Sequence, residues 1–251
     1  MFKSILSRFS SKPLEENDYN LSLATLGSDM HSHLIPGIDD GAKTIEDSIE
    51  LIRHLHSLGY QKLVTTPHIM SDYFRNTPEI ILSGLETVRA ALKEQQIPVE
   101  ISAAAEYYID DGFIRKLEEE KLMTFGDNYL LVEVSYINPP DNVRDVLFRA
   151  QVLGYKTILA HPERYPFWYR NLEEYQRFHD MGVLLQLNLN SLCGYYGPDA
   201  KRTAEKLIDM HIISAVGTDM HHIKHGAALS KVVNEKYLQK VLEAPLINRS
   251  L

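Results

Sequence analysis

The sequence predicts an α/β fold in which parallel strands form a closed or nearly closed barrel with helices on its outside. Short apolar runs alternate with amphipathic segments along most of the 251 residues, which is the pattern of βα units. Seven such alternations in one chain favour a barrel over an open sheet. The composition, 44% hydrophobic and 24% charged, is that of a globular domain with a sizeable core.

The strands are expected where short apolar runs precede a helical pattern. Each is short enough to be a buried parallel strand, and turn residues or the start of a helix follow it. The seven candidates are residues 28–33, 62–66, 99–105, 129–135, 157–160, 183–189 and 212–217.

The helices are predicted from residues that favour helix ends. Thr44 and Asp47 resemble a capping box, and the apolar spacing that follows them ends at Gly59. Thr77 and Pro78 combine an N-cap with a proline at the first helical position. Further helices are expected at residues 142–153 and 171–181, each followed by glycine, and from residue 198, a proline, onward.

Composition and charge exclude several classes of protein. No run of 18 apolar residues suggests a transmembrane helix, and residues 1–27 read as a polar arm without a secretory apolar stretch, before a domain at 28–251. The single cysteine, Cys193, excludes an intramolecular disulfide and fits a reducing, cytoplasmic compartment. With 26 basic and 34 acidic residues the formal net charge is −8, which disfavours nucleic-acid binding. We therefore expect neither nucleic acid nor stable membrane insertion.

Side chains of the metal-binding type occur at the ends of nearly all the predicted strands. The active site of a β/α barrel forms at the C-terminal ends of its strands. His31 and His33 are two positions apart, so on an extended backbone both face one side, and Asp219 and His221 repeat this spacing. The strand-end residues are His31, His33, His68, Glu106, Glu133, His161, Asp219 and His221. Imidazoles and carboxylates without thiolate suit Mn²⁺, Zn²⁺ or Fe²⁺, and a set of this size predicts more than one ion.

The prediction depends on the joint placement of these residues, because two histidines at such a spacing often arise by chance. His222 and His225 follow the last motif, and two roles remain open for them: support of the site or simple exposure. The other histidines are expected to be solvated or packed: His54, His56, His179 and His211.

The order H-x-H, an acidic residue, T-P-H, a glutamate, H-P-E-R and D-x-H resembles the polymerase and histidinol phosphatase (PHP) superfamily. The segments 34–41 (LIPGIDDG), 66–68 (TPH), 161–165 (HPERY) and 217–221 (GTDMH) narrow the resemblance. They are similar to the bacterial manganese-dependent protein-tyrosine phosphatases of capsule and exopolysaccharide synthesis, over about residues 28–245. The resemblance implies a distorted (β/α)7 barrel of the PHP type with a trinuclear metal centre.

The resemblance also implies a ligand set for two or three ions, most readily Mn²⁺, with Zn²⁺ or iron as alternatives. One ion would take His31, His33, Glu106 and Asp219, a second would take Glu106 and His161, and a third would take Asp40, His68 and His221. Glu133 stands where many superfamily members have a histidine, and a carboxylate can serve the same purpose.

Arg164 is implied to bind the phosphate. A second arginine is expected shortly after the D-x-H motif, but the sequence there reads HIKHG, with Lys224 as the available cation. Lysine is a point charge and lacks the bidentate fork of arginine. The site therefore departs from the family pattern at this position.

The chemistry predicted is metal-assisted hydrolysis of phosphotyrosine in a protein, such as the tail of a bacterial tyrosine kinase that controls capsular or exopolysaccharide synthesis. A thiol mechanism is excluded, because the position six residues after Cys193 is Asp199 and not the arginine of cysteine-dependent phosphatases. Activated water would attack the phosphorus, with Asp40 or His221 donating a proton through water. The tyrosine leaving group has a pKa of ~10 and needs little help from a general acid.

Aromatic residues are concentrated at the same rim, where they either stack on the substrate ring or form a small core under the loops. They are Tyr73, Phe74, Tyr107, Tyr136, Tyr165, Phe167, Trp168, Tyr195 and Tyr196. Three other functions remain open: a small-molecule phosphatase of the histidinol-phosphate type, a nuclease-like enzyme, and a metal-stabilised binding module without turnover. The sequence leaves an oligomer open as well.

Overall fold

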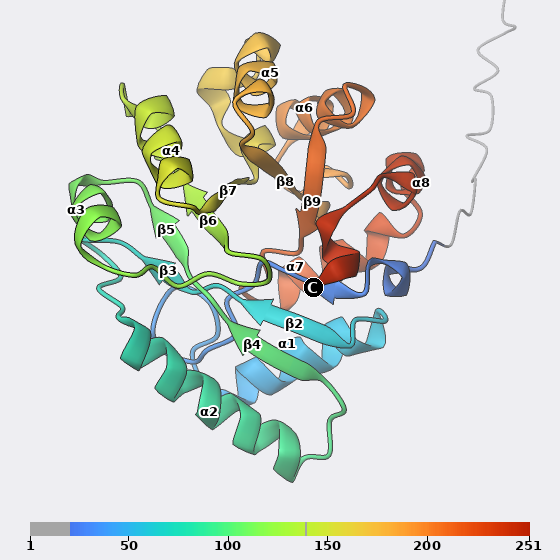
Figure 1. Cartoon of the computed structure of the whole chain (residues 1–251). Coiled ribbons are helices and arrows are strands. Elements are labelled where there is room, and N and C mark those ends of the chain that lie inside the picture. The colour runs from blue at the N-terminus through green and yellow to red at the C-terminus, as the bar shows by residue number, and fades with distance from the viewer. Residues whose placement is uncertain (1–20, 139) are drawn as a thin grey trace, which may run out of the picture.

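The computed structural model describes residues 21–138 and 140–251, which contain nine strands and eight α-helices (Figure 1). The strands are β1 (Ser28–Asp29), β2 (Lys62–Thr65), β3 (His68–Ile69), β4 (Glu100–Ala103), β5 (Glu106–Tyr108), β6 (Tyr129–Glu133), β7 (Lys156–Ala160), β8 (Leu184–Asn188) and β9 (Ile213–Gly217). The helices are α1 (Ile45–Ser57), α2 (Pro78–Glu94), α3 (Asp111–Glu119), α4 (Val143–Val152), α5 (Leu172–Asp180), α6 (Pro198–Asp209), α7 (Ile223–Val232) and α8 (Lys236–Glu243).

The strands form a ring of seven parallel segments, which is the distorted (β/α)7 barrel that the sequence predicts. One sheet has the order β1-β2-β4 and the other β3-β5-β6-β7-β8-β9. The sheets are continuous on one side, because β2 pairs with β4 and their continuations β3 and β5 also pair. On the other side, a parallel bridge joins Ser32 to Met220, and the Asp219 N–H donates to the His31 carbonyl at 2.7 Å.

The predicted strands at 62–66 and 99–105 are found as β2 and β4, and each is followed, beyond its predicted end, by a short second strand, β3 or β5. Pro67 follows β2 and has no N–H to donate to the ladder, so the pairing stops and restarts at His68. The prediction of one continuous strand at 28–33 is wrong. The β1 ladder ends at Asp29, and the backbone beyond it bonds to the segments after β2 and β9 and to Ala42.

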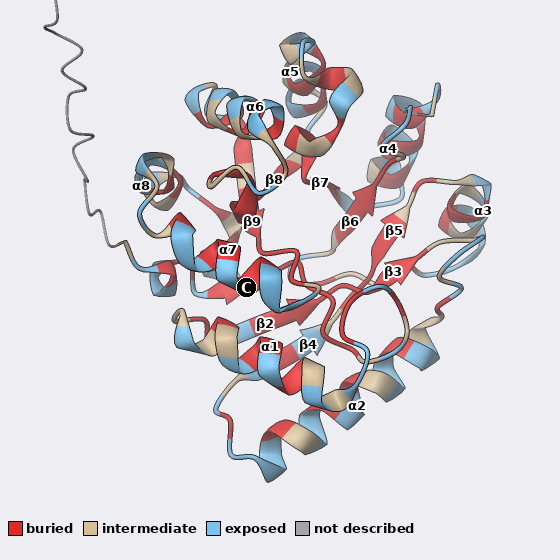
Figure 2. Ribbon diagram, turned by 180° about the vertical axis from the view of Figure 1, so that it is seen from behind, coloured by how far each residue is buried: buried red, intermediate tan, exposed pale blue. Residues whose placement is uncertain are grey.

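Helices cover the outside of the ring, and their buried faces point toward the strands (Figures 1 and 2). Thr44 caps α1 in the predicted capping box with Asp47, and Thr77 caps α2 ahead of Pro78. Three helices that the sequence analysis did not identify are α3, α7 and α8. Asp110 caps α3 by accepting a hydrogen bond from the Phe113 N–H at 2.7 Å.

Alternation along the strands places apolar side chains below the candidate site. In β6, Leu131 and Glu133 are two positions apart and so face the same side, and Leu131 is fully buried. Leu131 belongs to a buried cluster that also contains Val64, Ile158 and Ala215 from three other strands. The polar groups at the strand ends therefore lie above a packed apolar floor.

The part of the predicted arm at residues 1–20 lies outside the described residues. Leu23–Leu26 forms a short 3₁₀ helix, η1, in which Leu23 and Leu26 are fully buried. The Leu21 N–H donates to the Val233 carbonyl at 2.9 Å, so this end of the arm packs against the barrel. Among the helices of the described residues, none has the length and apolar character needed to cross a membrane.

Candidate metal centre

The candidate ligands meet at one end of the barrel, where the strands have their C-termini. His31, His33 and Asp40 follow β1, His68 begins β3, Glu106 begins β5, Glu133 ends β6, His161 follows β7, and Asp219 and His221 follow β9. Seven of the nine line a cavity of about 250 Å³: Asp40, His68, Glu106, Glu133, His161, Asp219 and His221. His31 and His33 are fully buried within hydrogen-bonding range of Glu106 or Asp219.

Four ligand atoms in this centre have the spacing of a single coordination sphere. His31 Nε2 lies 3.1 Å from Glu106 Oε2 and 3.3 Å from Asp219 Oδ1. His33 Nε2 lies 3.3 and 3.4 Å from the same two oxygens, and 3.4 Å from His31 Nε2. Two ligands with bonds of ~2.1 Å to one ion are ~3.0 Å apart at octahedral angles and ~3.4 Å apart at tetrahedral angles. The group fits a divalent ion.

Two further groups adjoin the first, one sharing His33 with it and the other sharing Glu106. Asp40 Oδ1 lies 3.3 Å from His221 Nε2 and 3.5 Å from His68 Nε2. Glu106 also reaches His161, whose Nε2 is 3.1 Å from Glu106 Oε1. Glu133 Oε2 lies 4.0 Å from the same His161 nitrogen, so Glu133 joins the side of the centre where the sequence placed it.

Buried polar atoms without hydrogen bonds point to the same conclusion. Asp219 Oδ1 and His68 Nδ1 are fully buried and form no hydrogen bond. His68 Nδ1 nevertheless lies 3.1 Å from Glu133 Oε1 and 3.3 Å from Glu106 Oε2. Buried acceptors at such short distances without hydrogen-bond geometry would be costly unless a cation satisfied them. The donor set of the centre therefore fits bound metal ions.

The ionisation of the centre follows from opposite charges packed closely together. Burial raises the pKa of Glu106 and of Asp219, but the neighbouring histidines lower it more, so both pKa values fall well below their ordinary range. Burial lowers the pKa of His68, but Glu133 and Glu106 raise it to about 9. The pKa values of His31 and His33 are raised as well, so without metal these three histidines tend to hold protons, which a metal ion must displace to bind.

Two residues that the sequence analysis missed fix the orientation of His31 and His33. Gln186 Oε1 lies 2.7 Å from His31 Nδ1, and Asp39 Oδ2 lies 2.8 Å from His33 Nδ1. Each acceptor holds the proton on Nδ1 and leaves Nε2 free to face Glu106 and Asp219. Asp39 was detectable as the neighbour of Asp40, and Gln186 as a polar residue inside the apolar β8 segment.

The backbone at two candidate ligands adopts a left-handed conformation. His161 has φ 34° and Asp219 has φ 49°, a region that residues other than glycine rarely occupy. Such conformations persist where the surrounding structure imposes them, often at functional sites. Gly217, just before Asp219, allows a close approach, because a Cβ there would lie 2.6 Å from His31 Cβ. The turn after β9 thus places Asp219 next to His31.

Arg164 extends into the cavity beside the candidate ligands. Its Nη1 donates to Asp219 Oδ2 at 2.6 Å, and its guanidinium carbon lies 4.1 Å from the Tyr196 ring centre and 5.0 Å from that of Tyr136. Among the described residues its guanidinium has no other hydrogen bond, so further N–H groups can bind an anion. Lys224 is exposed and does not line the cavity.

The aromatic residues at the rim divide between the two predicted roles. Phe74 and Tyr136 line the cavity, and the Phe74 ring stacks on His68 with a centroid distance of 5.5 Å. Tyr108 also lines the cavity, although the sequence analysis named its neighbour Tyr107 instead. Tyr107, one position earlier in β5, faces the opposite side and is buried. Several of the others are buried in the core: Tyr107, Tyr165 and Trp168.

The remaining histidines and the cysteine lie outside the cavity lining. His225 is buried and its Nδ1 lies 2.9 Å from the Asp219 carbonyl oxygen, so it supports the turn, whereas His222 is exposed. Cys193 does not line the cavity, and burial raises the pKa of its thiol. A raised pKa is the reverse of what a thiolate nucleophile requires.

Comparisons with known proteins identify relatives with related chemistry. Residues 27–245 match the family model described as capsular polysaccharide synthesis, CpsB/CapC. Tyrosine-protein phosphatase YwqE of Bacillus subtilis is 27% identical over 197 residues, which cover 78% of this chain and 78% of that protein. Tyrosine-protein phosphatase CpsB of Streptococcus pneumoniae is 28% identical over 201 residues, covering 78% of this chain and 83% of that protein.

A solved structure described as YwqE from Bacillus subtilis and CpsB from Streptococcus pneumoniae, unique metal-dependent tyrosine phosphatases, has a similar fold. It superposes with a TM-score of 0.76 at 25% identity, covering 88% of this chain and 95% of that chain.

Proposed function

Because its residues 27–245 match the family model, the chain belongs to the CpsB/CapC family of capsular polysaccharide synthesis, and we propose that it is a metal-dependent phosphatase acting on protein phosphotyrosine. The observation that carries the proposal is the set of four ligand atoms 3.1 to 3.4 Å apart next to an open cavity that contains Arg164. Arg164 suits a phosphate group in the cavity, and turnover of that phosphate distinguishes a phosphatase from a metal-stabilised binding module.

We assign the candidate ligands to two or three ions, with Mn²⁺ as the principal metal. His31, His33, Glu106 and Asp219 would hold the first ion, and Asp40, His68 and His221 the third. Glu106 and His161 would hold the second, with Glu133 lying 4.0 Å from His161 and 3.1 Å from His68. Bound divalent ions would hold the phosphate oxygens and lower the pKa of a water molecule from 15.7 to ~7.

The protein's own side chains then orient and stabilise the substrate. Arg164 is clamped between two tyrosine rings and hydrogen-bonded to Asp219, so its free N–H groups are directed into the cavity before substrate arrives. A preorganised guanidinium of this kind favours the charge that develops on the phosphoryl oxygens. Phe74 and Tyr136 form apolar walls for the phenyl ring of phosphotyrosine.

Neither Asp40 nor His221, the two residues expected to donate a proton through water, suits that role while it holds a metal ion, because a coordinating histidine is neutral and a coordinating carboxylate is ionised. Burial raises the pKa of Asp40, but the hydrogen bond and charge of His221 lower it below its ordinary value. Asp40 therefore stays ionised, as a ligand should and a general acid should not. The tyrosine phenol has a pKa of ~10 and is a good leaving group without strong acid assistance.

The natural substrate that we propose is the phosphorylated tail of a bacterial tyrosine kinase that controls capsular or exopolysaccharide synthesis. The family description and the names of the relatives support this choice. A cytoplasmic location is proposed with it, since the single cysteine suits a reducing compartment. The division into an arm at 1–27 and a catalytic domain at 28–251 belongs to the same proposal.

The test measures metal content and turnover together. Protein stripped with a chelator should lose hydrolysis of phosphotyrosine peptides and regain it with Mn²⁺, and it should prefer these peptides to histidinol phosphate. His31→Ala should lose both metal and activity, whereas His179→Ala, on the exposed side of α5, should lose neither. Full activity of metal-stripped protein, or a preference for histidinol phosphate, would refute the proposal.

A further inference from the structure

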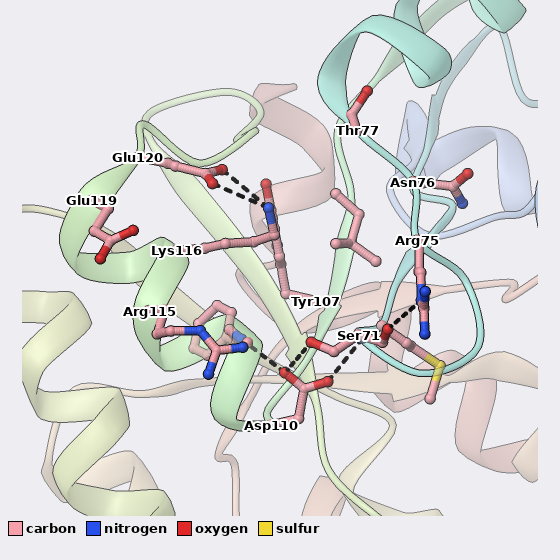
Figure 3. Close-up of a pocket in the computed structure, with 14 residues that line it drawn as sticks. Ser71, Arg75, Asn76, Thr77, Tyr107, Asp110, Arg115, Lys116, Glu119 and Glu120 are labelled. Atoms are coloured by element: carbon pink, nitrogen blue, oxygen red, sulfur yellow. Dashed lines mark hydrogen bonds and ion pairs between the residues drawn. The ribbon is translucent and has the colours of Figure 1, made fainter.

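A second cavity lies directly beside the metal centre and is shown in Figure 3. It measures about 310 Å³ and lies between the segment 69–77, after β3, and helix α3. Met70 lines both this cavity and the metal cavity, so the two are neighbours. Below, the second cavity is called the side cleft.

Hydrogen bonds between the segment 69–77 and the start of α3 fix the walls of the side cleft. Asp110 Oδ2 accepts from the Ser71 N–H at 2.9 Å, and Asp110 Oδ1 lies 3.0 Å from Ser71 Oγ and 2.7 Å from the Phe113 N–H. Gly112 permits this contact, because a Cβ there would lie 1.8 Å from Ser71 Oγ. Asn76 Nδ2 ties the loop to the His68 carbonyl at 2.8 Å. The cleft is thus rigidly connected to a candidate metal ligand.

Two arginines in the side cleft have no acidic partner. Arg75 and Arg115 are exposed, and neither forms an ion pair within the described part of the chain. Arg75 Nε donates to the Ser71 carbonyl at 2.8 Å, which orients its guanidinium and leaves its terminal N–H groups available. Figure 3 shows Arg75 on the loop and Arg115 on α3, at two sides of the linked Ser71 and Asp110.

The charges of the residues that line the cleft sum to zero, but within the described part of the chain the two arginines are not ion-paired. Asp110 already accepts three hydrogen bonds, and Lys116 pairs with Glu120 at 3.2 Å. The carboxylates of Asp110 and Glu119 balance the charges of Arg75 and Arg115, but among the described residues neither forms an ion pair with them. The two guanidinium groups thus keep N–H groups available for an anionic ligand.

We infer that the side cleft is a substrate-binding subsite that takes acidic side chains flanking the phosphotyrosine, held by Arg75 and Arg115. The inference rests on the proposed phosphatase function, since it requires a phosphotyrosine in the metal cavity. An extended peptide advances ~3.3 Å per residue, so residues two to four positions from the phosphotyrosine lie ~7 to 13 Å away, which suits two cavities that share Met70. The substrate class is therefore an acidic phosphotyrosine peptide.

The test compares two phosphotyrosine peptides that differ only in having glutamate or glutamine at the flanking positions. Exposed ion pairs contribute modestly, so the wild type should favour the glutamate peptide about three- to tenfold in kcat/KM. The double variant Arg75→Ala, Arg115→Ala should lose this preference through a higher KM, while kcat and the hydrolysis of p-nitrophenyl phosphate stay unchanged. High salt should reduce the preference as well.

Two single variants serve as controls. Arg53→Ala removes an exposed arginine that bonds to Gln95, beyond the other end of α2, and should keep the preference. Glu119→Gln removes the opposing charge and should strengthen the preference for the glutamate peptide.

Equal rates for the two peptides in the wild type, or an unchanged preference in the double variant, would overturn the inference while leaving the phosphatase function intact. A wild type that hydrolyses neither peptide nor p-nitrophenyl phosphate with Mn²⁺ would refute the phosphatase function, and the inference with it.

Discussion

Replacing Gln186 by leucine is the most direct test of how the protein prepares its metal centre. Gln186 hydrogen-bonds to the candidate ligand His31, whose Nδ1 lies 2.7 Å from Gln186 Oε1. Its amide nitrogen donates to the Leu187 carbonyl at 2.8 Å, which fixes the side-chain direction. Without this acceptor the imidazole proton can move to Nε2, the atom that faces Glu106 and Asp219. Leucine of similar size keeps the space filled while it removes the acceptor.

The expected magnitude follows from the lost hydrogen bond. Groups that orient a metal-binding histidine typically contribute ~10- to 100-fold to affinity, which corresponds to ~1.4 to 2.8 kcal/mol. Leaving the buried His31 N–H unpaired also costs about 1 to 3 kcal/mol of folding stability. Gln186→Leu should therefore bind Mn²⁺ about 10 to 100 times more weakly and unfold at a lower temperature. Gln186→Glu, which restores an acceptor, should recover the affinity.

The assay is calorimetric titration of metal-free protein with Mn²⁺, together with thermal unfolding. Gln151→Leu is the matched control, because Gln151 donates to Thr157 and to the Met181 carbonyl near the start of β7, at the opposite end of the strand from the ligands. It should lower stability without changing Mn²⁺ affinity. Equal Mn²⁺ affinity in Gln186→Leu and wild type would refute the reasoning.

Three other predictions follow from the same structure. Arg164→Ala should lower kcat/KM for aryl phosphates by about 100-fold or more, and Arg164→Lys should recover only part of it because the bidentate fork is lost; steady-state kinetics would contradict the assignment if the alanine variant were near wild type. Cys193→Ser should keep most of the phosphotyrosine activity, since the thiol pKa is raised and the residue lies outside the cavity; an inactive serine variant with native structure would revive a thiol mechanism. In the metal-free protein the pKa of His68 is raised from 6.5 to about 9, so its contribution to stability is complete below pH 6.5 and is lost as the pH rises through about 9. Melting temperatures should thus fall over this interval without metal but not with Mn²⁺, where the histidine is neutral throughout; parallel curves would show that His68 does not bind metal.

The sequence predicted the ring of strands and the meeting of the ligands because both depend on local, periodic signals. His31 and His33 share a face through their two-residue spacing, and Glu106, His161 and Asp219 each follow the C-terminal end of a predicted strand. Any parallel barrel brings strand ends together. The main elements therefore needed no knowledge of side-chain packing.

The residues that the sequence did not reveal act through contacts between distant segments. Gln186 meets His31 across 155 positions, and its role depends on the direction of one amide group. The interruption at Pro67 was visible as a proline, yet only pairing with β5 shows that the strand resumes. Lys224, the available cation in place of a second phosphate-binding arginine, is exposed outside the cavity. Its direction depends on where α7 begins, which the sequence analysis did not predict.

The charges of the centre constrain how many ions it can hold. The four carboxylate ligands, Asp40, Glu106, Glu133 and Asp219, contribute −4, and Asp39 and Arg164 contribute −1 and +1, so the set carries −4 when its histidines are neutral. Two divalent ions neutralise this charge, and a third leaves an excess of +2. A phosphate monoester carries nearly −2 at neutral pH. A site with three ions would thus become neutral only when a substrate phosphate is bound, whereas a site with two ions is already neutral when empty. Because buried charge is unfavourable without a partner, the third ion should bind more weakly than the first two, and phosphate or its analogues should increase its affinity.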